Sequence, residues 1–381
     1  MTSPSDSPAI AIVGTYPPTQ CGIATFTRSL GNALRANGPT GIVRVMEPGQ
    51  VDTHLNNSPE IVSRWIRGDR ASRRDALASL RNFSAVVIQH EFGIFGGEDG
   101  EDIIEFLEDC EIPSIVVMHT AVANPLPNHI RIVEAIGKLA DVVVVQSWAC
   151  KQRLCATTSL DPGVVQVIPH GATLNLSGPA KRITDSPLIV TWGLLGHGKG
   201  IEHGIEALAG LQDLVPKPVY AVIGETHPNV KARVGESYRQ SLIDLAAERG
   251  LSDQVIFDDS YRDTESLLRI VRGADVILLP YDSREQVTSG VLVEAVASGK
   301  PIVATAFPHA TEMLESGLGL VVRHGDSEQM TAALRRILVS PSLRANMQRQ
   351  AWREAASLAW PAVANRYLEL AAQISSTRVA A

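Results

Sequence analysis

The sequence predicts an α/β protein made of two doubly wound domains in tandem. Its 381 residues are 45% hydrophobic, which is more than a single core usually organises. Short β-branched apolar runs alternate with helix-length segments along the chain, a pattern typical of a parallel sheet covered on both faces. Two such domains imply an interdomain cleft, where a ligand is expected to bind.

The expected strands fall into two series separated by one polar stretch. They are predicted at residues 10–14, 86–89, 115–118, 142–146 and 165–168 in the first series, and at residues 188–192, 219–223, 255–257, 276–279, 301–304 and 320–322 in the second. Residues 175–187 between the series contain Gly and Pro and lack apolar periodicity, so they are expected to form a linker with the boundary near residue 180.

Three segments follow from this division. The first domain is expected at residues 1–178, the second at 188–358, and a terminal helix at 359–381. The helix should begin near Trp360-Pro361, because proline cannot continue a preceding helix without a kink.

The composition disfavours a nucleic-acid-binding protein and a disulfide-rich or zinc-binding one. The net charge of -7 and a pI near 5.8 provide no basic face for nucleic acid. Four cysteines in so long a chain do not make a disulfide framework, and their spacing is not a zinc pattern. With no signal peptide and no run of 18 or more apolar residues, a soluble cytoplasmic protein is expected.

Ligands of open α/β sheets bind beyond the carboxyl ends of the strands, so candidate binding residues are expected there. The first strand runs into "GTYPPTQCGIATF", which lacks the GxGxxG pattern of a dinucleotide fingerprint and therefore disfavours a nicotinamide dehydrogenase. Gly22 in this loop still allows a ligand to approach the backbone at the start of the next helix.

Two further strands of the first domain end in histidine. The segment "HEFGIFGGEDG" places His90, Glu91 and Phe92 beside a glycine-rich loop, which is either a capped loop with a core aromatic residue or a site of polar substrate recognition. His119 follows the strand 115–118, and a histidine at that place is either structural or part of a ligand site.

The second domain has a phosphate-binding pattern after its first strand. In "GLLGHGKG" four glycines free the backbone, Lys199 adds positive charge, and the N-terminus of the next helix points to the same place. Residues 193–199 also match the start of a P-loop, but Gly200 stands where a Ser or Thr would bind magnesium, which disfavours a nucleoside triphosphatase.

The stretch "EQVTSGVLVEA" is expected to open a buried helix. A helix that starts near Ser289 or Gly290 has free backbone amides at its N-terminus. Glu294 lies one turn further on the same face, and a buried carboxylate there needs a partner such as ligand hydroxyls.

One charge pattern has two interpretations. Arg64, Arg67, Arg70 and Arg73 recur every three residues, and an acidic segment follows at residues 98–111. These residues are either solvated helix faces or a docking face for an anionic acceptor or a membrane.

Six of these segments, in this order, resemble glycosyltransferase family 4, whose members are retaining enzymes of the GT-B fold that use nucleotide-sugar donors. They are "GTYPPTQCGIATFTRSL", "VVMHT", "VIPHG", "GLLGHGKG", "QVTSGVLVEAVASGKPIVAT" and "LAWPAVANRYLEL". The resemblance covers almost the whole chain. It implies an acceptor-binding first domain, a donor-binding second domain, and a terminal helix that crosses back to the first.

The resemblance also implies residue roles. Lys199 would contact the donor diphosphate, the amides of Ser289 and Gly290 the phosphate or the transferred sugar, and Glu294 the ribose. His119 would lie beside the transferred sugar and Gly22 near the phosphates. The loop that contains Tyr261 would receive the nucleobase, and the segment of His90, Glu91 and Phe92 would hold the acceptor. A catalytic set of His119, Lys199 and Gln286 follows.

Two positions depart from the family pattern. Leu194 stands where the phosphate loop usually has Arg, so one cation is missing, and His197, Arg262 or another group is expected to replace it. Gln286 stands where the first Glu of the family's E-x7-E region is expected, with Glu285 beside it. Gln still donates and accepts hydrogen bonds but carries no charge.

The sequence thus predicts a retaining hexosyltransferase that needs neither a metal nor another cofactor. The donor would be GDP-mannose or, as the second choice, UDP-glucose, and the acceptor a saccharide, free or lipid-linked. Two alternatives stay open: a sugar-nucleotide epimerase with the same two-domain plan, and a non-catalytic module that binds nucleotide sugars.

Overall fold

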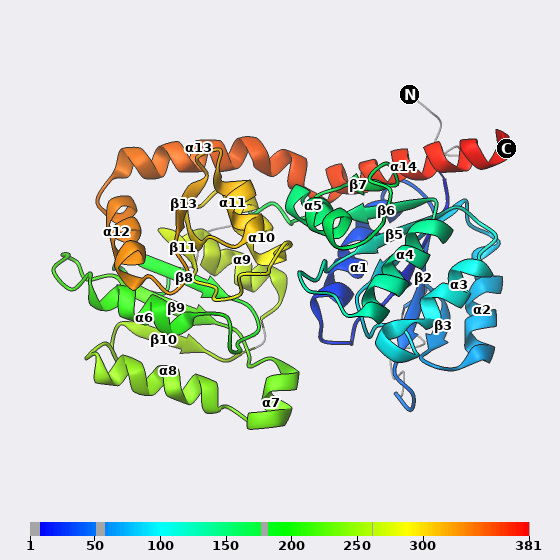
Figure 1. The fold of residues 1–381 in the computed structure, drawn as a ribbon. Coiled ribbons are helices and arrows are strands. Elements are labelled where there is room, and N and C mark those ends of the chain that lie inside the picture. The colour runs from blue at the N-terminus through cyan, green and yellow to red at the C-terminus, as the bar shows by residue number, and fades with distance from the viewer. Residues whose placement is uncertain (1–7, 51–57, 177–181, 261, 381) are drawn as a thin grey trace. The chain divides into compact units, whose positions relative to one another are not determined.

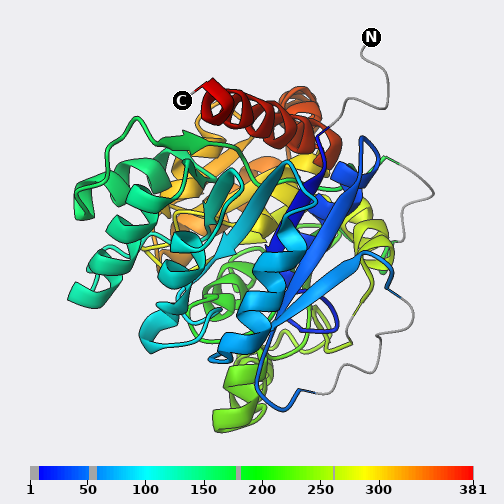
Figure 2. The same ribbon diagram turned by 90° about the vertical axis from the view of Figure 1, so that its right-hand side faces the viewer.

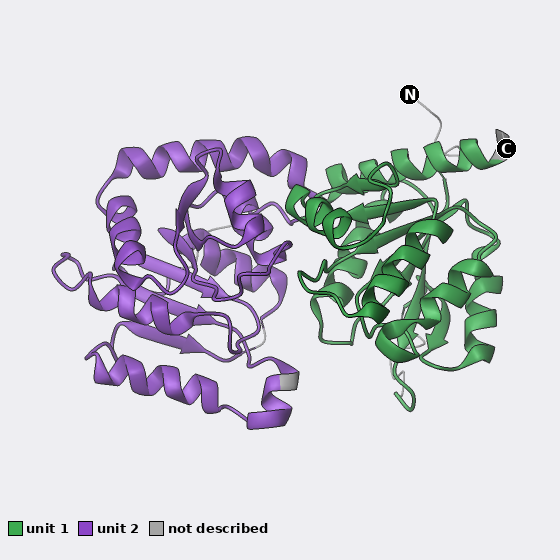
Figure 3. Cartoon of the chain, in the orientation of Figure 1, with its two compact units in different colours: residues 1–171, 360–381 green, residues 172–359 purple. Residues whose placement is uncertain are grey.

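The structure is a computed structural model that describes residues 8–50, 58–176, 182–260 and 262–380. The chain divides into two compact units, coloured separately in Figure 3. Unit 1 consists of Met1–Gly171 and Trp360–Ala381, and unit 2 of Ala172–Ala359. Each unit has its own sheet.

Unit 1 contains a sheet of seven strands, counted over the described residues, in the order β3-β2-β1-β4-β5-β6-β7. All neighbouring strands pair in parallel, and Figure 2 shows them side by side. The strands are β1 (Ile10–Gly14), β2 (Thr40–Met46), β3 (Ile61–Ile66), β4 (Ala85–His90), β5 (Ser114–Met118), β6 (Val142–Val145) and β7 (Val165–Val167).

Helices cover the unit 1 sheet, and polar side chains cap the N-termini of several of them. The helices are α1 (Gly22–Arg35), α2 (Arg70–Leu80), the short 3-10 helix η2 (Glu98–Gly100), α3 (Asp102–Glu108), α4 (Pro127–Leu139), α5 (Trp148–Thr157) and α14 (Trp360–Ala380). Asp69 caps α2 by accepting hydrogen bonds from the N–H groups of Ala71 and Ser72. Such caps satisfy backbone donors that the first turn of a helix cannot pair.

Both faces of the central strands of unit 1 are buried, as the continuous apolar runs predict. In β1, Ile10 and Ile12 pack into one core with Phe26 of α1 and Tyr367 of α14, while Ala11 on the opposite face is equally buried. Residues 360–380 therefore complete the core of unit 1, although 188 residues of unit 2 precede them along the chain.

Unit 2 contains a sheet of six parallel strands, again counted over the described residues, in the order β10-β9-β8-β11-β12-β13. The strands are β8 (Leu188–Trp192), β9 (Val219–Ile223), β10 (Val255–Asp258), β11 (Val276–Leu279), β12 (Ile302–Thr305) and β13 (Gly319–Val322). Figure 1 shows the helices around this sheet, which are α6 (Ile201–Ala209), α7 (Pro228–Val234), α8 (Ser237–Glu248), α9 (Thr264–Gly273), α10 (Gly290–Ala297), α11 (Pro308–Leu314), α12 (Ser327–Leu338) and α13 (Pro341–Leu358).

Two cores lie on opposite faces of the unit 2 sheet. One contains Leu188 and Val190 of β8 together with Leu292 of α10, and the other contains Ile189 of the same strand with Ile205 of α6. Alternate residues of one strand thus enter different cores, which fixes α6 and α10 on opposite sides of the sheet.

Two strands of unit 1 were not predicted. β2 has Arg44 and β3 has Ser63 and Arg64 among the apolar residues, so neither is an uninterrupted apolar run. The predicted repeat of arginines on one helix face is wrong, because Arg64 lies on β3 whereas Arg73 lies on α2.

The division between the units lies before the predicted linker. The chain passes from unit 1 to unit 2 between Gly171 and Ala172, rather than near residue 180. Asn175 is 4% exposed and donates to the carbonyl of Leu268 in unit 2 at 2.8 Å, so the polar stretch begins inside unit 2. No helix among the described residues is both long and apolar enough to cross a bilayer.

The packing of α14 predicts a sharp difference between two substitutions of Tyr367. This side chain is 1% exposed in the unit 1 core, and its hydroxyl has no hydrogen-bond partner among the described residues. Tyr367→Ala should lower the free energy of unfolding of unit 1 by about 3–5 kcal/mol, whereas Tyr367→Phe should leave it within about 1 kcal/mol. Urea unfolding of both variants checks this, and equal losses would contradict the packing described.

Candidate functional site

The strand order of unit 2 reverses at β8. After β8 the chain adds β9 and β10 on one side of it, and then returns to add β11 on the other side. In open α/β sheets, ligands bind at such a switch point, beyond the carboxyl ends of the strands. The two loops at this point are residues 193–200 after β8 and residues 280–289 after β11.

These two loops contact each other through backbone atoms. The N–H of Asp282 donates to the carbonyl of Gly198 at 3.0 Å. Gly200 has a φ of 62°, and a Cβ there would lie 1.9 Å from the carbonyl oxygen of Pro280. Only glycine fits this left-handed position against backbone, so the glycine loop is fitted closely to the loop after β11.

Lys199 in the glycine loop is a half-buried cation. Its Nζ lies 4.3 Å from the ring centroid of Tyr281, which is 1% exposed. No carboxylate of a described residue lies within ion-pair distance of it. Burial lowers the pKa of Lys199, because an ammonium loses hydration there. The site can thus accept an anion.

The N-terminus of α10 lies beside the glycine loop. A Cβ on Gly193 would be 3.7 Å from Cγ2 of Val291 in the first turn of α10. Ser289 is the N-cap, and its Oγ accepts from the N–H of Leu292 at 3.2 Å. For the N–H of Gly290, no partner is found among the described residues.

The resemblance implied that the N–H of Ser289 contacts the donor, but this N–H already has a partner within unit 2. It donates to Nδ1 of His309 at 2.9 Å, and both residues are 2% exposed. His309 is the second residue of α11, which follows β12, so its position becomes clear only once the strands are assembled.

Glu294 is a half-buried carboxyl group one turn into α10. One of its oxygens accepts a hydrogen bond from Nε1 of Trp192 at 3.2 Å. Burial raises the pKa of Glu294, because the ionised form loses hydration. The second oxygen has no partner among the described residues, which leaves it able to accept from ligand hydroxyls.

A cavity of about 160 Å³ lies at the same edge of unit 2. It is lined by Trp192, Gly193, Leu194, Ile223, Gly224, Glu225, Ser260, Arg262 and Leu267. The indole of Trp192 connects this cavity to Glu294, because its ring lines the cavity and its N–H reaches the carboxyl group. Tyr261, predicted to receive the nucleobase, lies outside the described residues.

The two residues proposed to replace the missing phosphate-loop arginine are engaged elsewhere. Nε of Arg262 donates to Asp258 at 2.6 Å, which pairs its charge. The ring of His197 lies 4.6 Å from that of Tyr238 of α8, and it is exposed. Leu194 lines the cavity, so an apolar side chain stands where the family pattern has a cation.

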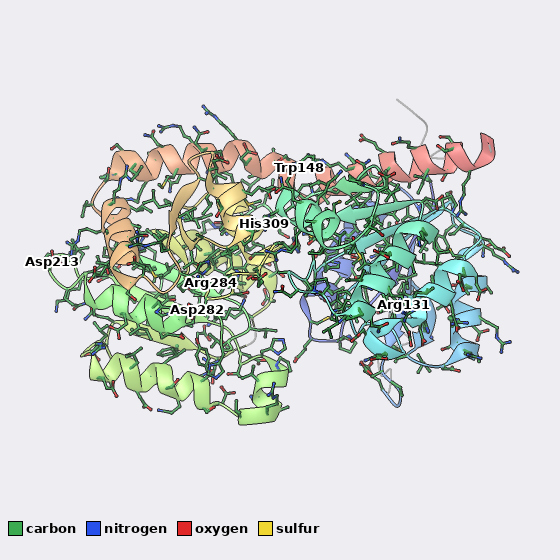
Figure 4. All side chains as sticks on the ribbon, viewed as in Figure 1. Arg131, Trp148, Asp213, Asp282, Arg284 and His309 are labelled. Atoms are coloured by element: carbon green, nitrogen blue, oxygen red, sulfur yellow. The ribbon has the colours of Figure 1, made fainter. Side chains whose placement is uncertain are left out.

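One group of side chains in unit 2 could hold a cation. Glu202 and His203 of α6 and Asp282 of the loop after β11 have ligand atoms within 4.8 Å of one another, and Figure 4 labels Asp282. Nε2 of His203 lies 3.1 Å from Asp282, and Glu202 accepts from the hydroxyl of Tyr238 at 2.7 Å. His203, Asp282 and Glu202 thus already have partners within the protein. The expectation of a metal-free reaction stays a prediction.

Unit 1 has its own switch point at β1, between β2 and β4. Gly22 is the exposed first residue of α1, and a Cβ there would meet no atom within 4 Å. Cys21 caps the helix, with Sγ accepting from the N–H of Ala24 at 3.3 Å. An alanine at position 22 would therefore fit the protein without a clash. A requirement for glycine there would have to come from a bound ligand.

Two glutamines hold the ring of His119. Nε2–H donates to Oε1 of Gln89 at 2.7 Å, and Nδ1 accepts from Nε2 of Gln146 at 3.3 Å. Burial, with His170 and His90 nearby, lowers the pKa of His119 to about 3. His119 is therefore neutral near pH 7, in the tautomer with the proton on Nε2.

The predicted acceptor segment is largely packed into unit 1. His90 is 1% exposed, with its ring 5.3 Å from that of Phe92. Glu91 accepts hydrogen bonds from the Thr120 hydroxyl and from the N–H of Phe92, and burial raises its pKa. Glu91 and Phe92 keep partial exposure, whereas the side chain of His90 lies in the interior.

The arginines and acids of unit 1 pair with each other. Arg73 of α2 forms ion pairs with Glu105 and Asp109 at α3, and Arg70 lies 4.0 Å from the same Glu105. Arg67 pairs with Glu47. Arg70 and Arg73 are thus paired with the acidic segment and Arg67 with Glu47, which disfavours a docking face for an anionic acceptor or membrane.

Most of unit 2 is similar to a known protein family. Residues 177–354 match the family model described as Glycosyl transferases group 1. A D-inositol 3-phosphate glycosyltransferase of Stackebrandtia nassauensis is 26% identical over 267 residues, which is 66% of this chain and 58% of that protein. The chain spans about half the length of the curated relatives it matches.

Solved structures match over nearly the whole chain. HepE from Anabaena in complex with UDP has a TM-score of 0.76 at 15% identity, covering 96% of this chain and all of that one. Sucrose-phosphate synthase from Thermosynechococcus elongatus has a TM-score of 0.74 at 20% identity, covering 97% and 100%. The prediction of the GT-B class with two parallel-sheet α/β domains is confirmed.

Burial of His90 predicts a pH dependence of stability. Burial lowers the pKa of His90 to about 4 from its ordinary value of 6.5. Between these values the unfolded chain binds a proton that the folded unit does not, so stability is lost as the pH falls from 6.5 towards 4. His90→Phe should remove about 1.4 kcal/mol per pH unit of this loss in that range. Chemical unfolding at several pH values checks this, and parallel curves for the two proteins would refute it.

Proposed function

We propose that this chain transfers a hexose from a nucleotide diphosphate sugar to a hydroxyl of a saccharide acceptor, with retention of the anomeric configuration. The observation that carries the proposal is Lys199, a half-buried cation with no carboxylate partner among the described residues, at the switch point of unit 2. A cation in such a place needs an anion, and the N-terminus of α10 favours the same charge.

The groups of unit 2 suit the parts of a nucleotide sugar in order. The nucleobase would enter the cavity lined by Trp192 and Leu194, and the ribose hydroxyls would donate to the free oxygen of Glu294. The diphosphate would lie between Lys199 and the N–H of Gly290. The likeness of residues 177–354 to group 1 glycosyl transferases supports this assignment.

Transfer then depends on positioning and charge stabilisation. As the bond from the sugar to the diphosphate breaks, negative charge grows on the departing phosphate, where Lys199 and the α10 N-terminus stabilise it. The acceptor attacks the same face of the sugar, and the departing phosphate takes its proton. Retention rests on the resemblance to glycosyltransferase family 4.

In unit 2, Gln286 would position the transferred sugar, whereas the role proposed for His119 of unit 1 rests on the resemblance to glycosyltransferase family 4. The side chain of Gln286 is half-buried, and no hydrogen-bond partner is found for it among the described residues. It could therefore donate to or accept from sugar hydroxyls. The low pKa of His119 and its two glutamine partners suit a fixed neutral ring rather than a proton carrier.

The donor is proposed as GDP-mannose or UDP-glucose. GDP-mannose is the choice suggested by the resemblance to family 4, whereas solved neighbours of the same fold include HepE with UDP and glucose. For the acceptor we propose a saccharide hydroxyl, held by unit 1 at Glu91 and Phe92.

The epimerase alternative needs an acid and a base beside the sugar. The candidates for those roles are His119 and Glu91, and both have their polar atoms engaged within unit 1. Incubation with donor but without acceptor separates the two enzymes, because only an epimerase would change the sugar. A binding module would neither transfer the sugar nor slowly hydrolyse the donor.

The donor is identified by thermal-shift measurements with GDP-mannose, UDP-glucose, UDP-GlcNAc and ADP-glucose. A specific donor should raise the melting temperature with its concentration, because it binds the folded chain only. NMR of the product made from that donor should then show the anomeric configuration of the donor. Absence of any shift at millimolar concentrations, or inversion in the product, would count against the proposal.

Loss of the Lys199 charge should reduce transfer strongly. Lys199→Ala should cost about 2–4 kcal/mol of transition-state stabilisation, measured as kcat/KM. Lys231→Ala serves as the matched control, because Lys231 is an exposed cation of unit 2 paired with Glu236. Near-normal turnover of Lys199→Ala would show that the assignment of the diphosphate site is wrong.

Chelation should leave activity intact. Lys199 and the α10 N-terminus would do the work of magnesium at the diphosphate, so transfer in excess EDTA should stay within about twofold of that without it. Asp282→Asn, which alters the Glu202, His203 and Asp282 group, tests the same point in the absence of chelator. Complete loss of transfer in EDTA, restored by a divalent ion, would overturn this site assignment.

A further inference from the structure

We infer that His309 is a positioning residue that clamps the loop Gln286–Ser289 and so fixes the groups offered to the transferred sugar. This inference rests on the proposed function for its ligand, but its structural part can be measured separately. Figure 4 labels His309 in unit 2, on the helix that follows β12.

The clamp consists of two hydrogen bonds from one residue. Nδ1 of His309 accepts from the N–H of Ser289 at 2.9 Å, and the N–H of His309 donates to the carbonyl of Gln286 at 3.5 Å. Both ends of the loop are thus attached to the first turn of α11. Because Nδ1 accepts, a neutral His309 carries its proton on Nε2.

The clamp decides which backbone amide a ligand meets. Since the N–H of Ser289 is occupied, the first amide of α10 without a partner among the described residues is that of Gly290. A shift of the loop would move Gln286 as well, because Gln286 precedes Ser289 by only three residues. One buried imidazole therefore sets the position of both groups.

The loop also carries a hydroxyl that lacks a partner. Oγ1 of Thr288 is shielded from solvent, and the described residues provide no hydrogen bond to it. Leaving a shielded hydroxyl unpaired costs free energy, so such groups usually meet a partner in the functional state. Thr288 and Gln286 together suit the hydroxyls of a hexose, beside the N–H of Gly290 that the diphosphate would meet.

Two substitutions of His309 separate this role from simple packing. His309→Leu fills a similar volume without an acceptor, whereas Oδ1 in His309→Asn can take the place of Nδ1. Ser298→Ala is the matched control, because Ser298 is equally buried and donates to Ala295 at 2.6 Å at the other end of α10.

The first readout is hydrogen exchange of the peptide 286–293. Exchange there should accelerate at least about tenfold in His309→Leu and stay close to wild type in His309→Asn and Ser298→Ala. Unchanged exchange in His309→Leu would overturn the clamp, whatever the enzyme's activity.

The second readout is kinetic. His309→Leu should lower kcat up to about 100-fold, the effect of misplacing a reacting group by about 1 Å, while the affinity for the nucleoside diphosphate alone changes less than about threefold. His309→Asn should recover most of kcat. Equal losses in the two variants, or full kcat in His309→Leu, would overturn the positioning role. A wild-type chain that transfers no sugar, yet shows the expected exchange, would contradict the proposed function and leave the clamp standing.

Discussion

The candidate site of unit 2 depends on one topological constraint: the loops that follow two neighbouring parallel strands run to helices on opposite faces of the sheet, and these loops meet at its carboxyl edge. β8 has α6 on one side of the sheet, while α10 after β11 lies on the other. The glycine loop and the start of α10 therefore meet at one edge without covering each other. Lys199, Glu294 and the cavity beside Trp192 all belong to this edge.

Electrostatics distinguishes this edge from the charged surface of unit 1. The ion pairs between α2 and α3 join largely exposed acids to arginines, and such pairs contribute at most about 1 kcal/mol each. Lys199 and Glu294 are each half-buried, and neither is paired with an opposite charge among the described residues. Unpaired burial is unfavourable in the free protein, so it is more readily explained by a ligand than by stability.

Much of the fold could be predicted because buried parallel strands are continuous apolar runs. Leu188–Trp192 and Val219–Ile223 were predicted with their observed bounds, and so was the start of α10, since Ser289 is a good N-cap before an apolar helix. β2 and β3 escaped prediction because polar residues interrupt their apolar pattern. The boundary was placed too late because polarity alone does not reveal that Asn175 is buried in unit 2.

From the sequence, candidate site residues could be proposed only where they directly follow a strand or begin a helix. Lys199, Gly290 and Glu294 come directly after strands or at a helix start, and so could be chosen from the sequence. Nothing local links His309 to Ser289 or Trp192 to Glu294, because those contacts form only when β8, β11 and β12 lie side by side. The engaged amide of Ser289 is the clearest case of a role that the assembled sheet changes.

We propose that the edge of unit 2 binds a nucleoside diphosphate with its ribose at Glu294. It is tested most directly by calorimetric titration of the wild-type chain and Glu294→Ala with the ribonucleoside diphosphate of the preferred base and with its 2′,3′-dideoxy analogue. We expect the wild-type chain to bind the ribonucleotide at least about tenfold more tightly than the dideoxy analogue, and Glu294→Ala to bind both alike. A preference for the ribonucleotide that survives in Glu294→Ala would contradict it.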